Sequence, residues 1–531
     1  MTKRRIIVLG LDAMSPKLML DWVRDGTLPC IGSLLERGLS GSIEGLDGYF
    51  IGSTWPSFYT GVSPAKHGFH YQHQLVPGTY QLHDVADGEP TRCPPFWCRL
   101  GDAGLRVALL DIPLSRLDPA VNGIQVVEWG VHDDLYGPGT QPPELQSEIA
   151  SKFGPHLVGA KCDGASRTAT DYCEFTDRLV QSIATKTNLT RHLLARESWD
   201  LFVQVFSESH CVGHQCWHLH EVEHPGHDPT LAATSGDPVR RVYKALDNAI
   251  SEILADVSDA TVIVMSAHGM THWYGAQFLL RDVLIQLGAA MPLPTPVSTR
   301  GARDVLLELA GAGWRRLPVS LRHRLAPLRS RLGRVSNAGP RLATAGLEPS
   351  LSLCFPLSNG MGTSGIRLNV TGREPQGRLQ AGVELEAFVA SLTADLLALE
   401  EATTGARLVH RVVRTADTYT GPCLDVLPDL VVEWSRDHAV GSSLVNEDRG
   451  GELAVRHPRF GTVTGVNRYG RTGEHTPDGW FIVTGPNVPT GVEREVGILD
   501  FAPTICWLLG VQHEGFDGKP IKRICEPESP T

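Results

Sequence analysis

The run Ile6-Ile-Val-Leu-Gly-Leu11, which ends directly at Asp12, decides the fold of this chain. An uninterrupted apolar run is typical of a strand whose two faces are both covered by helices. In a strand with one solvent-exposed face, apolar and polar residues alternate. The run is shorter than the apolar region of a secretory signal peptide, and no small-residue cleavage site follows it. We therefore interpret Ile6–Leu11 as the buried first strand of a cytoplasmic α/β protein.

Short apolar runs of the same kind recur along the chain and alternate with longer amphipathic segments. Further strands are predicted at Val107–Ile112, Ile124–Trp129, Leu201–Phe206, Thr261–Ser266, Ile366–Val370, Leu430–Trp434 and Trp480–Thr484. Helices are predicted at Pro16–Arg37, Asp171–Arg196, Pro238–Val257, Val383–Leu399 and Leu499–Leu509. This alternation predicts a three-layer αβα sandwich around a mostly parallel central sheet.

Charge and composition exclude several classes of protein. The 531 residues contain 48 Lys and Arg against 59 Asp and Glu, a net charge of −11, whereas a nucleic-acid-binding protein carries a basic excess. No stretch approaches about 18 uncharged apolar residues, so no membrane span is predicted. The 11 cysteines lack zinc-type pairs, which favours reduced thiols in the cytoplasm. Whether the chain forms a homo-oligomer stays open.

One segment departs from the alternation of predicted strands and helices. We expect a single domain over residues 1–531 that contains an Arg-rich helical insertion at residues 281–345, where nine Arg lie between Arg300 and Arg334. A solvated helical surface explains these charges. A cap that brings Arg side chains to an anionic substrate or to a partner subunit explains them as well.

Ionisable side chains gather where the predicted strands end. Asp12 ends the first strand, His210 and His268 follow the strands Leu201–Phe206 and Thr261–Ser266, and His475 lies just before the strand at Trp480. In parallel sheets the functional residues meet at the carboxyl ends of the strands. We therefore expect these four side chains at one edge of the sheet.

The densest cluster is a group of six histidines between His210 and His227. His210 and His214 are four residues apart, so on a helix both imidazoles face the same side and can bind one metal ion. Such a pair alone is more often a coincidence of the helix surface, but its place at a strand end favours a metal site. We interpret the later histidines of the group, His218, His220, His224 and His227, as loop or rim residues.

A hydroxyl-rich segment, Gly52-Ser-Thr54-Trp-Pro56-Ser57, supplies a candidate nucleophile. Thr54 stands at a helix-like start, where a hydroxyl is commonly only an N-cap. In the functional interpretation a metal ion lowers the pKa of the Thr54 hydroxyl, so that it attacks as a nucleophile.

These segments together resemble the type I phosphodiesterase/nucleotide pyrophosphatase branch of the alkaline phosphatase superfamily. The resemblance is carried by landmarks in the family's order along nearly the whole chain. They are Ile7-Val-Leu-Gly-Leu-Asp12, Thr54-Trp-Pro to Pro64-Ala-Lys-His67-Gly68, Leu368-Asn369 to Gly377, Pro428-Asp429, Gly473-Glu-His475 and Leu499-Asp500 to Thr504.

The resemblance implies an alkaline phosphatase-like fold and a site for two divalent ions, usually zinc. One ion is expected on Asp12, Thr54, an Asp and the following His268. The other is expected on an Asp, the His214 that follows it by four residues, and His475. Two positions depart from the pattern, because Ala267 and His210 stand where the family has these two aspartates.

Both departures remove negative charge. The set His210, His214 and His475 offers three neutral nitrogens, which suits Zn²⁺ with one open position. The other set has lost a ligand, for which Glu208, Glu474 or the substrate could substitute. We expect one or two ions, preferably Zn²⁺, with Fe or Mn as alternatives.

The resemblance implies a metal-dependent phosphoric-ester hydrolase that acts on a small-molecule substrate. Thr54 would be the nucleophile and would form a phospho-threonine intermediate. A related metalloenzyme acting on a sulfate, phosphonate or carbon–oxygen bond is one alternative. A non-catalytic binding protein that has lost metal ligands is the other.

Overall fold

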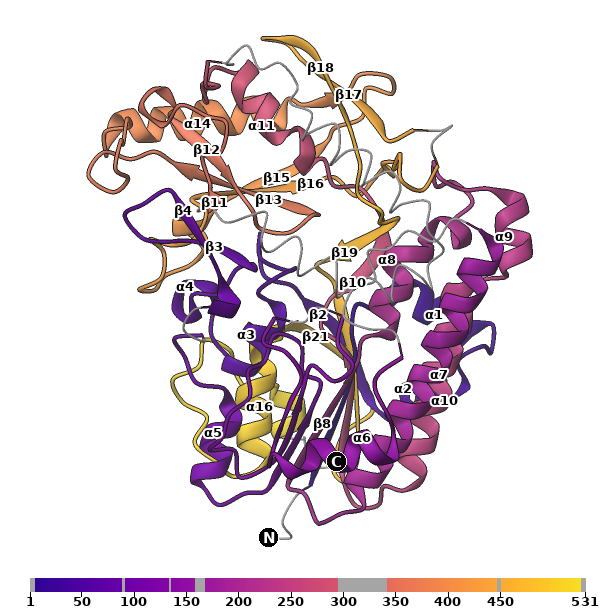
Figure 1. Ribbon diagram of the computed structural model, residues 1–531. Coiled ribbons are helices and arrows are strands. Elements are labelled where there is room, and N and C mark those ends of the chain that lie inside the picture. Colours follow the sequence, from indigo (N-terminus) through magenta and orange to yellow (C-terminus); the bar gives the residue numbers. More distant parts are fainter. Residues whose placement is uncertain are drawn as a thin grey trace.

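The computed structural model describes residues 5–87, 91–132, 135–157, 168–294, 341–446 and 450–526. Its centre is a nine-stranded sheet (Figure 1). The strand order is β21 (Gly491–Gly497), β2 (Leu39–Glu44), β20 (Gly479–Thr484), β9 (Thr261–Ser266), β1 (Ile6–Leu11), β8 (Leu201–Phe206), β5 (Val107–Leu110), β6 (Gly123–Val127) and β7 (Gly139–Gln141). The five neighbours from β9 to β6 are parallel, whereas β20 and β7 are antiparallel to their neighbours.

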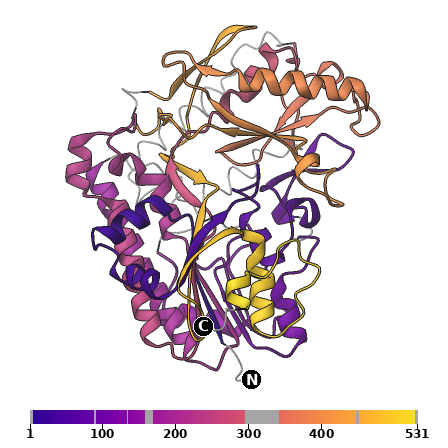
Figure 2. The same cartoon turned by 180° about the vertical axis from the view of Figure 1, so that it is seen from behind.

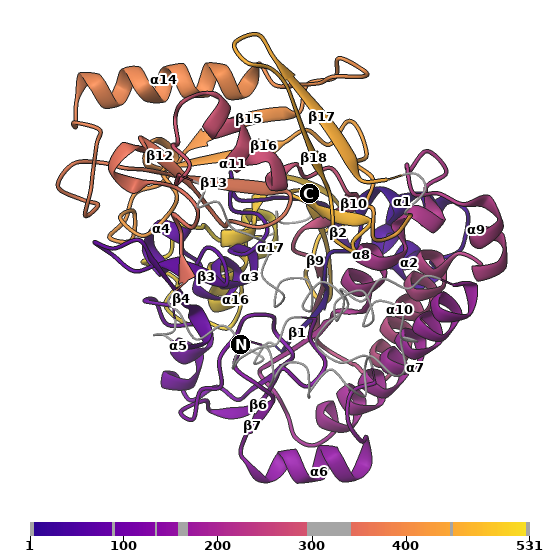
Figure 3. The same ribbon diagram turned by 45° about the horizontal axis from the view of Figure 1, so that its top comes forward.

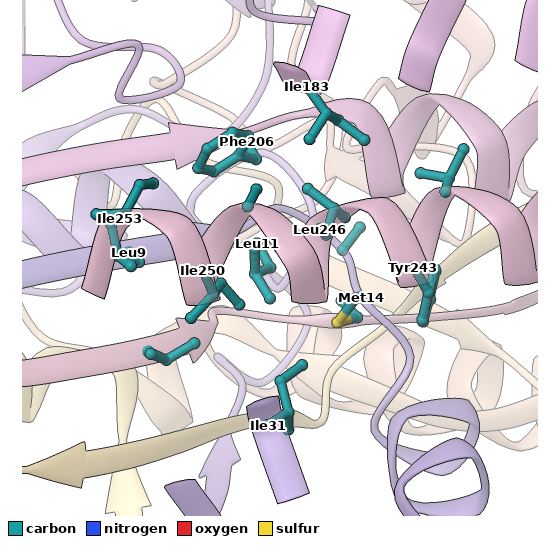
Figure 4. Close-up of a cluster of buried hydrophobic side chains, with 14 of the residues drawn as sticks. Leu9, Leu11, Met14, Ile31, Ile183, Phe206, Tyr243, Leu246, Ile250 and Ile253 are labelled. Atoms are coloured by element: carbon teal, nitrogen blue, oxygen red, sulfur yellow. The ribbon is translucent and has the colours of Figure 1, made fainter. Parts of the chain in front are cut away.

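Helices cover both faces of this sheet (Figures 1 and 2). One face carries α1 (Pro16–Arg24), α2 (Pro29–Arg37), α7 (Ala169–Leu194), α8 (Glu208–His220) and α10 (Pro238–Ala255), and the other carries α3 (Thr54–Thr60), α5 (Phe96–Asp102) and α16 (Phe501–Leu508). The side chains of β1 alternate between the two cores: Leu9 and Leu11 pack with α10 in the first (Figure 4), and Val8 packs in the second. The predicted three-layer αβα sandwich is therefore confirmed.

Smaller elements complete this part of the chain. They are α4 (Pro64–His67), α6 (Glu144–Lys152), α9 (Pro229–Ser235), α17 (Lys522–Cys525) and two small sheets, one of β10 (Gly269–His272) with β19 (Gly473–Thr476) and one of β11 (Arg341–Leu342), β4 (Gln81–Asp84) and β3 (His73–Leu75). None of the helices in the described ranges is both long and apolar enough to cross a membrane.

The helix predicted at Pro16–Arg37 is in fact two helices, α1 and α2. The break lies at Gly26, whose φ of +80° is a left-handed conformation that glycine adopts without strain. Pro29 then starts α2, because proline fits the first turn of a helix and lacks the N–H needed in the interior.

The strands predicted at Ile366–Val370 and Leu430–Trp434 do not belong to the central sheet. They form an antiparallel sheet in the order β12 (Cys354–Leu357), β13 (Thr363–Leu368), β16 (Leu430–Trp434) and β15 (Val409–Arg414). With α11 (Gln277–Gln286) and α14 (Val383–Leu397) this upper sheet encloses a core of its own (Figure 3). An apolar run predicts a buried strand but not the sheet that it joins.

The upper part also contains a three-stranded sheet of β14 (Glu400–Glu401), β17 (Glu452–His457) and β18 (Gly461–Val466), and the one-turn helix α15 (Thr415–Thr418). The Arg-rich insertion predicted at residues 281–345 falls largely on residues 295–340, which lie outside the described residues. The interpretation of its charges therefore stays a prediction.

A fully buried lysine, Lys186 of α7, lies beneath the carboxyl edge of the sheet. Its Nζ donates to the carbonyl oxygen of Gly130 at 2.8 Å and lies 3.5 Å from Asp111 Oδ2 and 3.6 Å from Glu208 Oε1. Burial alone would raise the pKa of Glu208, but Lys186 and the hydrogen bonds from His156 and Ser182 lower it to about 2. Lys186 therefore balances two buried carboxylates.

We predict that Lys186→Met lowers the free energy of unfolding by about 3–5 kcal/mol, because removing one partner of a buried ion pair leaves uncompensated charge. Urea denaturation measures the effect. Lys244→Met, at an exposed position on α10, is the matched control and should change stability by less than about 0.5 kcal/mol. Equal urea midpoints for the two variants would contradict the role of Lys186 in compensating the charges of Asp111 and Glu208.

Candidate metal centre

The carboxyl edge of the central sheet brings together the side chains that the strand ends predict. Asp12 ends β1, His210 lies in the first turn of α8 directly after β8, His268 follows β9, and His475 lies in β19. The ring centroids of His475 lie 4.6 Å from His210 and 4.5 Å from His268, and His268 Nε2 lies 3.7 Å from Asp12 Oδ1. All four side chains are buried.

Two histidines of α8 are each held by a hydrogen bond from Nδ1. His210 Nδ1 donates to Asp12 Oδ2 at 2.7 Å, and His214 Nδ1 donates to the carbonyl oxygen of Gly473 at 2.7 Å. Because a carbonyl can only accept, the Nδ1 of His214 carries the proton and its Nε2 carries a lone pair. A carboxylate or carbonyl that holds Nδ1 in this way is the usual support of a metal-binding histidine.

Close backbone packing places Gly473 at this position. A Cβ added to Gly473 would lie 2.3 Å from the carbonyl oxygen of Gly213, so any larger residue would push β19 away from α8. The amide of Thr472 also donates to the carbonyl oxygen of His214 at 2.6 Å. α8 and the chain around Gly473 are therefore in direct backbone contact.

A third histidine, His132, completes this cluster and was not predicted. Candidate ligand atoms of His132, His210 and His214 all lie within 4.8 Å of one another, and the ring of His132 stacks on that of His210 with centroids 4.0 Å apart. His132 follows β6 by five residues, so the strand-end rule that found the other residues could have found it.

A second group of possible ligands shares His214. Candidate ligand atoms of His214, Glu474 and His475 also lie within 4.8 Å of one another. Glu474, named above as a possible substitute ligand, therefore belongs to this group. The other substitute, Glu208, is bonded to Ser182 at 2.7 Å, on the side of Lys186.

The Thr54 hydroxyl is hydrogen-bonded to the backbone. Thr54 begins α3, is fully buried, and donates its Oγ1 hydrogen to the carbonyl oxygen of Phe50 at 2.7 Å. Among the described residues that line the cavity beside the histidines, this segment contributes Ile51, Gly52 and Trp55. Thr54 therefore makes no N-cap bond, and its predicted contact with a metal ion stays a prediction.

Orphaned nitrogens show that the cluster fits a bound cation. Within the described part of the chain, both ring nitrogens of His268 and the Nδ1 of His475 are buried without a hydrogen-bond partner, although buried polar atoms are nearly always satisfied in folded proteins. Nitrogen-rich donor sets of this kind suit zinc, and imidazole also suits iron. Ala267 offers no ligand beside His268.

Electrostatics favours neutral imidazoles here. Burial holds the pKa of His268 below the usual range, and it holds the pKa values of His214 and His475 well below that range. Burial alone would raise the pKa of Asp12, but the neighbouring His210 outweighs it, so the pKa of Asp12 lies well below its usual range. His214, His268 and His475 are therefore neutral near pH 7, and Asp12 is ionised.

An arginine, Arg471, also reaches the cluster from the segment that precedes β19. Its Nη1 lies 3.3 Å from His214 Nε2, and its Nη2 lies 3.5 Å from His132 Nε2. The sequence held no signal for this contact, because a single arginine in a loop is ordinarily a solvated surface residue.

Comparison with known proteins gives one family match. A family model described as type I phosphodiesterase/nucleotide pyrophosphatase matches residues 6–300. Among solved structures, phosphonoacetate hydrolase from Sinorhizobium meliloti 1021 in complex with phosphonoformate is 14% identical with a TM-score of 0.49 over 96% of each chain. Murine ectonucleotide pyrophosphatase/phosphodiesterase 5 in complex with AMP is 11% identical with a TM-score of 0.45, covering 97% of this chain and 98% of that one. A comparison with curated proteins finds no match.

We predict that His214→Ala and His132→Ala each weaken zinc binding by more than about tenfold, since each removes a candidate ligand. Competition with a chromogenic chelator measures the affinity. His220→Ala is the control, because His220 is on the same helix but its Nδ1 bonds to Asp237 at 2.8 Å, outside the cluster. If His132→Ala binds zinc with unchanged affinity, His475 rather than His132 would be the third ligand beside His210 and His214.

Proposed function

The chain belongs to the type I phosphodiesterase/nucleotide pyrophosphatase family, and we propose that it is a metal-dependent hydrolase of small-molecule phosphate esters. The observation that carries this proposal is the convergence of His132, His210 and His214, whose candidate ligand atoms all lie within 4.8 Å of one another. The Nδ1 atoms of His210 and His214 are bonded to Asp12 and Gly473, which orients the two rings. We propose Zn²⁺ as the ion, with Fe or Mn as alternatives.

His132, His210 and His214 would hold this ion, and Asp12, His268 and His475 would surround the reacting phosphoryl group. A divalent ion in this position polarises a phosphoryl oxygen and acidifies water. Asp12 keeps the ring of His210 in the required orientation through the Nδ1 hydrogen bond. The Nε1–H of Trp55 bonds to the other carboxylate oxygen of Asp12 at 2.8 Å, which fixes the indole as a wall of the cavity.

Water, rather than Thr54, is the nucleophile that we propose. The Thr54 hydroxyl is buried and donates to the carbonyl oxygen of Phe50, whereas His268 lines the cavity and its two ring nitrogens have no hydrogen-bond partner among the described residues. Neutral His268 would hold the attacking water at one nitrogen and accept its proton, which is the role of a general base.

The cavity wall supports a substrate with an apolar or aromatic group. Beside the histidines the cavity is lined by Ile51, Trp55, Phe69, Tyr71, Pro113 and Leu114. These surfaces favour apolar contact and aromatic stacking. Aryl phosphates and aryl phosphodiesters are therefore the first substrates to test.

We predict that zinc-loaded protein hydrolyses aryl phosphates, aryl phosphodiesters or both, that EDTA removes this activity, and that zinc restores it. A chromogenic panel that also contains an aryl sulfate measures the rates. A zinc-loaded, folded protein with no turnover on the panel would contradict the proposal. It would favour the second candidate function, a non-catalytic binding protein. Ala267, which stands in place of an acidic ligand, supports this candidate.

We predict that Thr54→Ala keeps kcat within about threefold of the wild-type value, whereas His268→Ala lowers it by about 10²–10⁴-fold, the usual contribution of a general base. Steady-state kinetics at saturating zinc measures both. Loss of turnover in Thr54→Ala with zinc binding intact, together with rescue by Thr54→Ser, would instead assign the nucleophile to Thr54 and restore a phospho-threonine intermediate.

A further inference from the structure

The loop after β5 contains a leucine whose backbone lies in the left-handed region. The amide of Ser115 donates to the carbonyl oxygen of Ile112 at 3.2 Å, which closes a turn with Pro113 and Leu114 at its centre. The φ of Leu114 is +59°. Proline is common at the second position of such a turn, but a left-handed φ at the third position favours glycine or asparagine, because a bulky side chain is strained there. Leucine is therefore an unfavourable residue for this turn.

Hydrogen bonds from two other elements hold the loop in this conformation. The Tyr59 hydroxyl of α3 donates to the carbonyl oxygen of Leu114 at 3.0 Å. At the start of the loop, Asp111 Oδ1 accepts from the amides of Trp129 and Gly130 at 2.9 and 3.1 Å. Backbone strain of this kind persists only where the surrounding structure imposes it, and strained residues cluster at functional sites.

Packing in the cores does not explain the choice of leucine. Leu114 is half-buried and belongs to none of the three apolar cores that the described residues form. It does line the cavity beside the histidines, together with the preceding Pro113. Trp55 and His268 line the same cavity. The strained residue is therefore part of the wall of the candidate site.

We propose that Leu114 is a specificity-determining residue, held in its left-handed conformation so that it contacts the organic group of the substrate. This inference rests on the proposed function and names the part of the cavity wall that selects an aryl group. Contact with an aryl ring removes apolar surface of Leu114 from water, which increases affinity. A substrate whose organic group is a single methyl gains much less from this contact.

Calorimetric titration of zinc-loaded protein with phenylphosphonate and with methylphosphonate tests the proposal without turnover. The two ligands share the anionic group and differ in the ring. We expect the wild type to bind phenylphosphonate more tightly than methylphosphonate. Leu114→Ala and Leu114→Gly should each weaken phenylphosphonate binding by about three- to tenfold, because most of the apolar contact is lost, and should change methylphosphonate binding by less than about twofold.

Urea denaturation of the same two variants tests the strain. At an ordinary position glycine is less stable than alanine, because it loses more backbone freedom on folding, whereas a left-handed φ favours glycine. Leu114→Gly should therefore have a higher urea midpoint than Leu114→Ala.

Leu117 is the matched control position. It is a partly exposed leucine of the same loop, its φ is outside the left-handed region, and it is not among the described residues that line the cavity. Leu117→Gly should have a lower urea midpoint than Leu117→Ala, and Leu117→Ala should bind both phosphonates as the wild type does.

An unchanged phenylphosphonate affinity in both Leu114 variants overturns the proposal, as does a wild type without a preference for phenylphosphonate. An equal loss of affinity for both ligands overturns it too, because Leu114 would then support the anion site rather than select the organic group. A higher urea midpoint for Leu114→Ala than for Leu114→Gly overturns the strained conformation on which the proposal depends. Failed hydrolysis of the substrate panel counts against the proposed function alone, since neither titration depends on turnover.

Discussion

The hydrogen bond between Asp12 and His210 joins the two strands on which the rest of the site depends. β1 and β8 pair in parallel with Leu11 opposite Phe206, so the chain leaves both strands at the same level of the sheet. Asp12 accepts from His210 through its side chain and from the Ser209 hydroxyl through its carbonyl oxygen, both at 2.7 Å. These two hydrogen bonds fix the start of α8 to the end of β1. The other candidate ligands surround this contact.

Charge is the second constraint on the site. Removing carboxylates from a buried cluster leaves neutral imidazoles, which hold an ion without reducing its formal charge as much as carboxylates do. Asp12 and Glu474 are the acidic side chains in the described part of the cluster. The anionic substrate that we propose would therefore depend on the charge of the ion, since the chain as a whole carries a net charge of −11.

The residues at the strand ends could be predicted from the sequence. Asp12 and His268 directly follow apolar runs, and the carboxyl ends of parallel strands lie at one edge of the sheet. The pair on α8 could be predicted from its spacing. His132 also follows a predicted strand, so the same rule could have found it. Arg471 is an ordinary loop arginine that only three-dimensional proximity identifies. The direction of the Thr54 side chain depends on the exact residue at which α3 begins, and a propensity pattern does not fix helix starts that finely. The upper sheet was missed for a related reason, because apolar runs do not specify their pairing partners.

The small sheet of β10 and β19 has a thermodynamic consequence. β10 follows β9 of the central sheet, and β19 connects β18 of the upper part to β20 of the central sheet. An ion that binds His214 and His475 together would restrain the segment through which the chain passes between the two cores. Ion occupancy and the docking of the upper part are then linked equilibria, and a ligand at 100 times its Kd adds about 2.7 kcal/mol to the stability of the state that it binds.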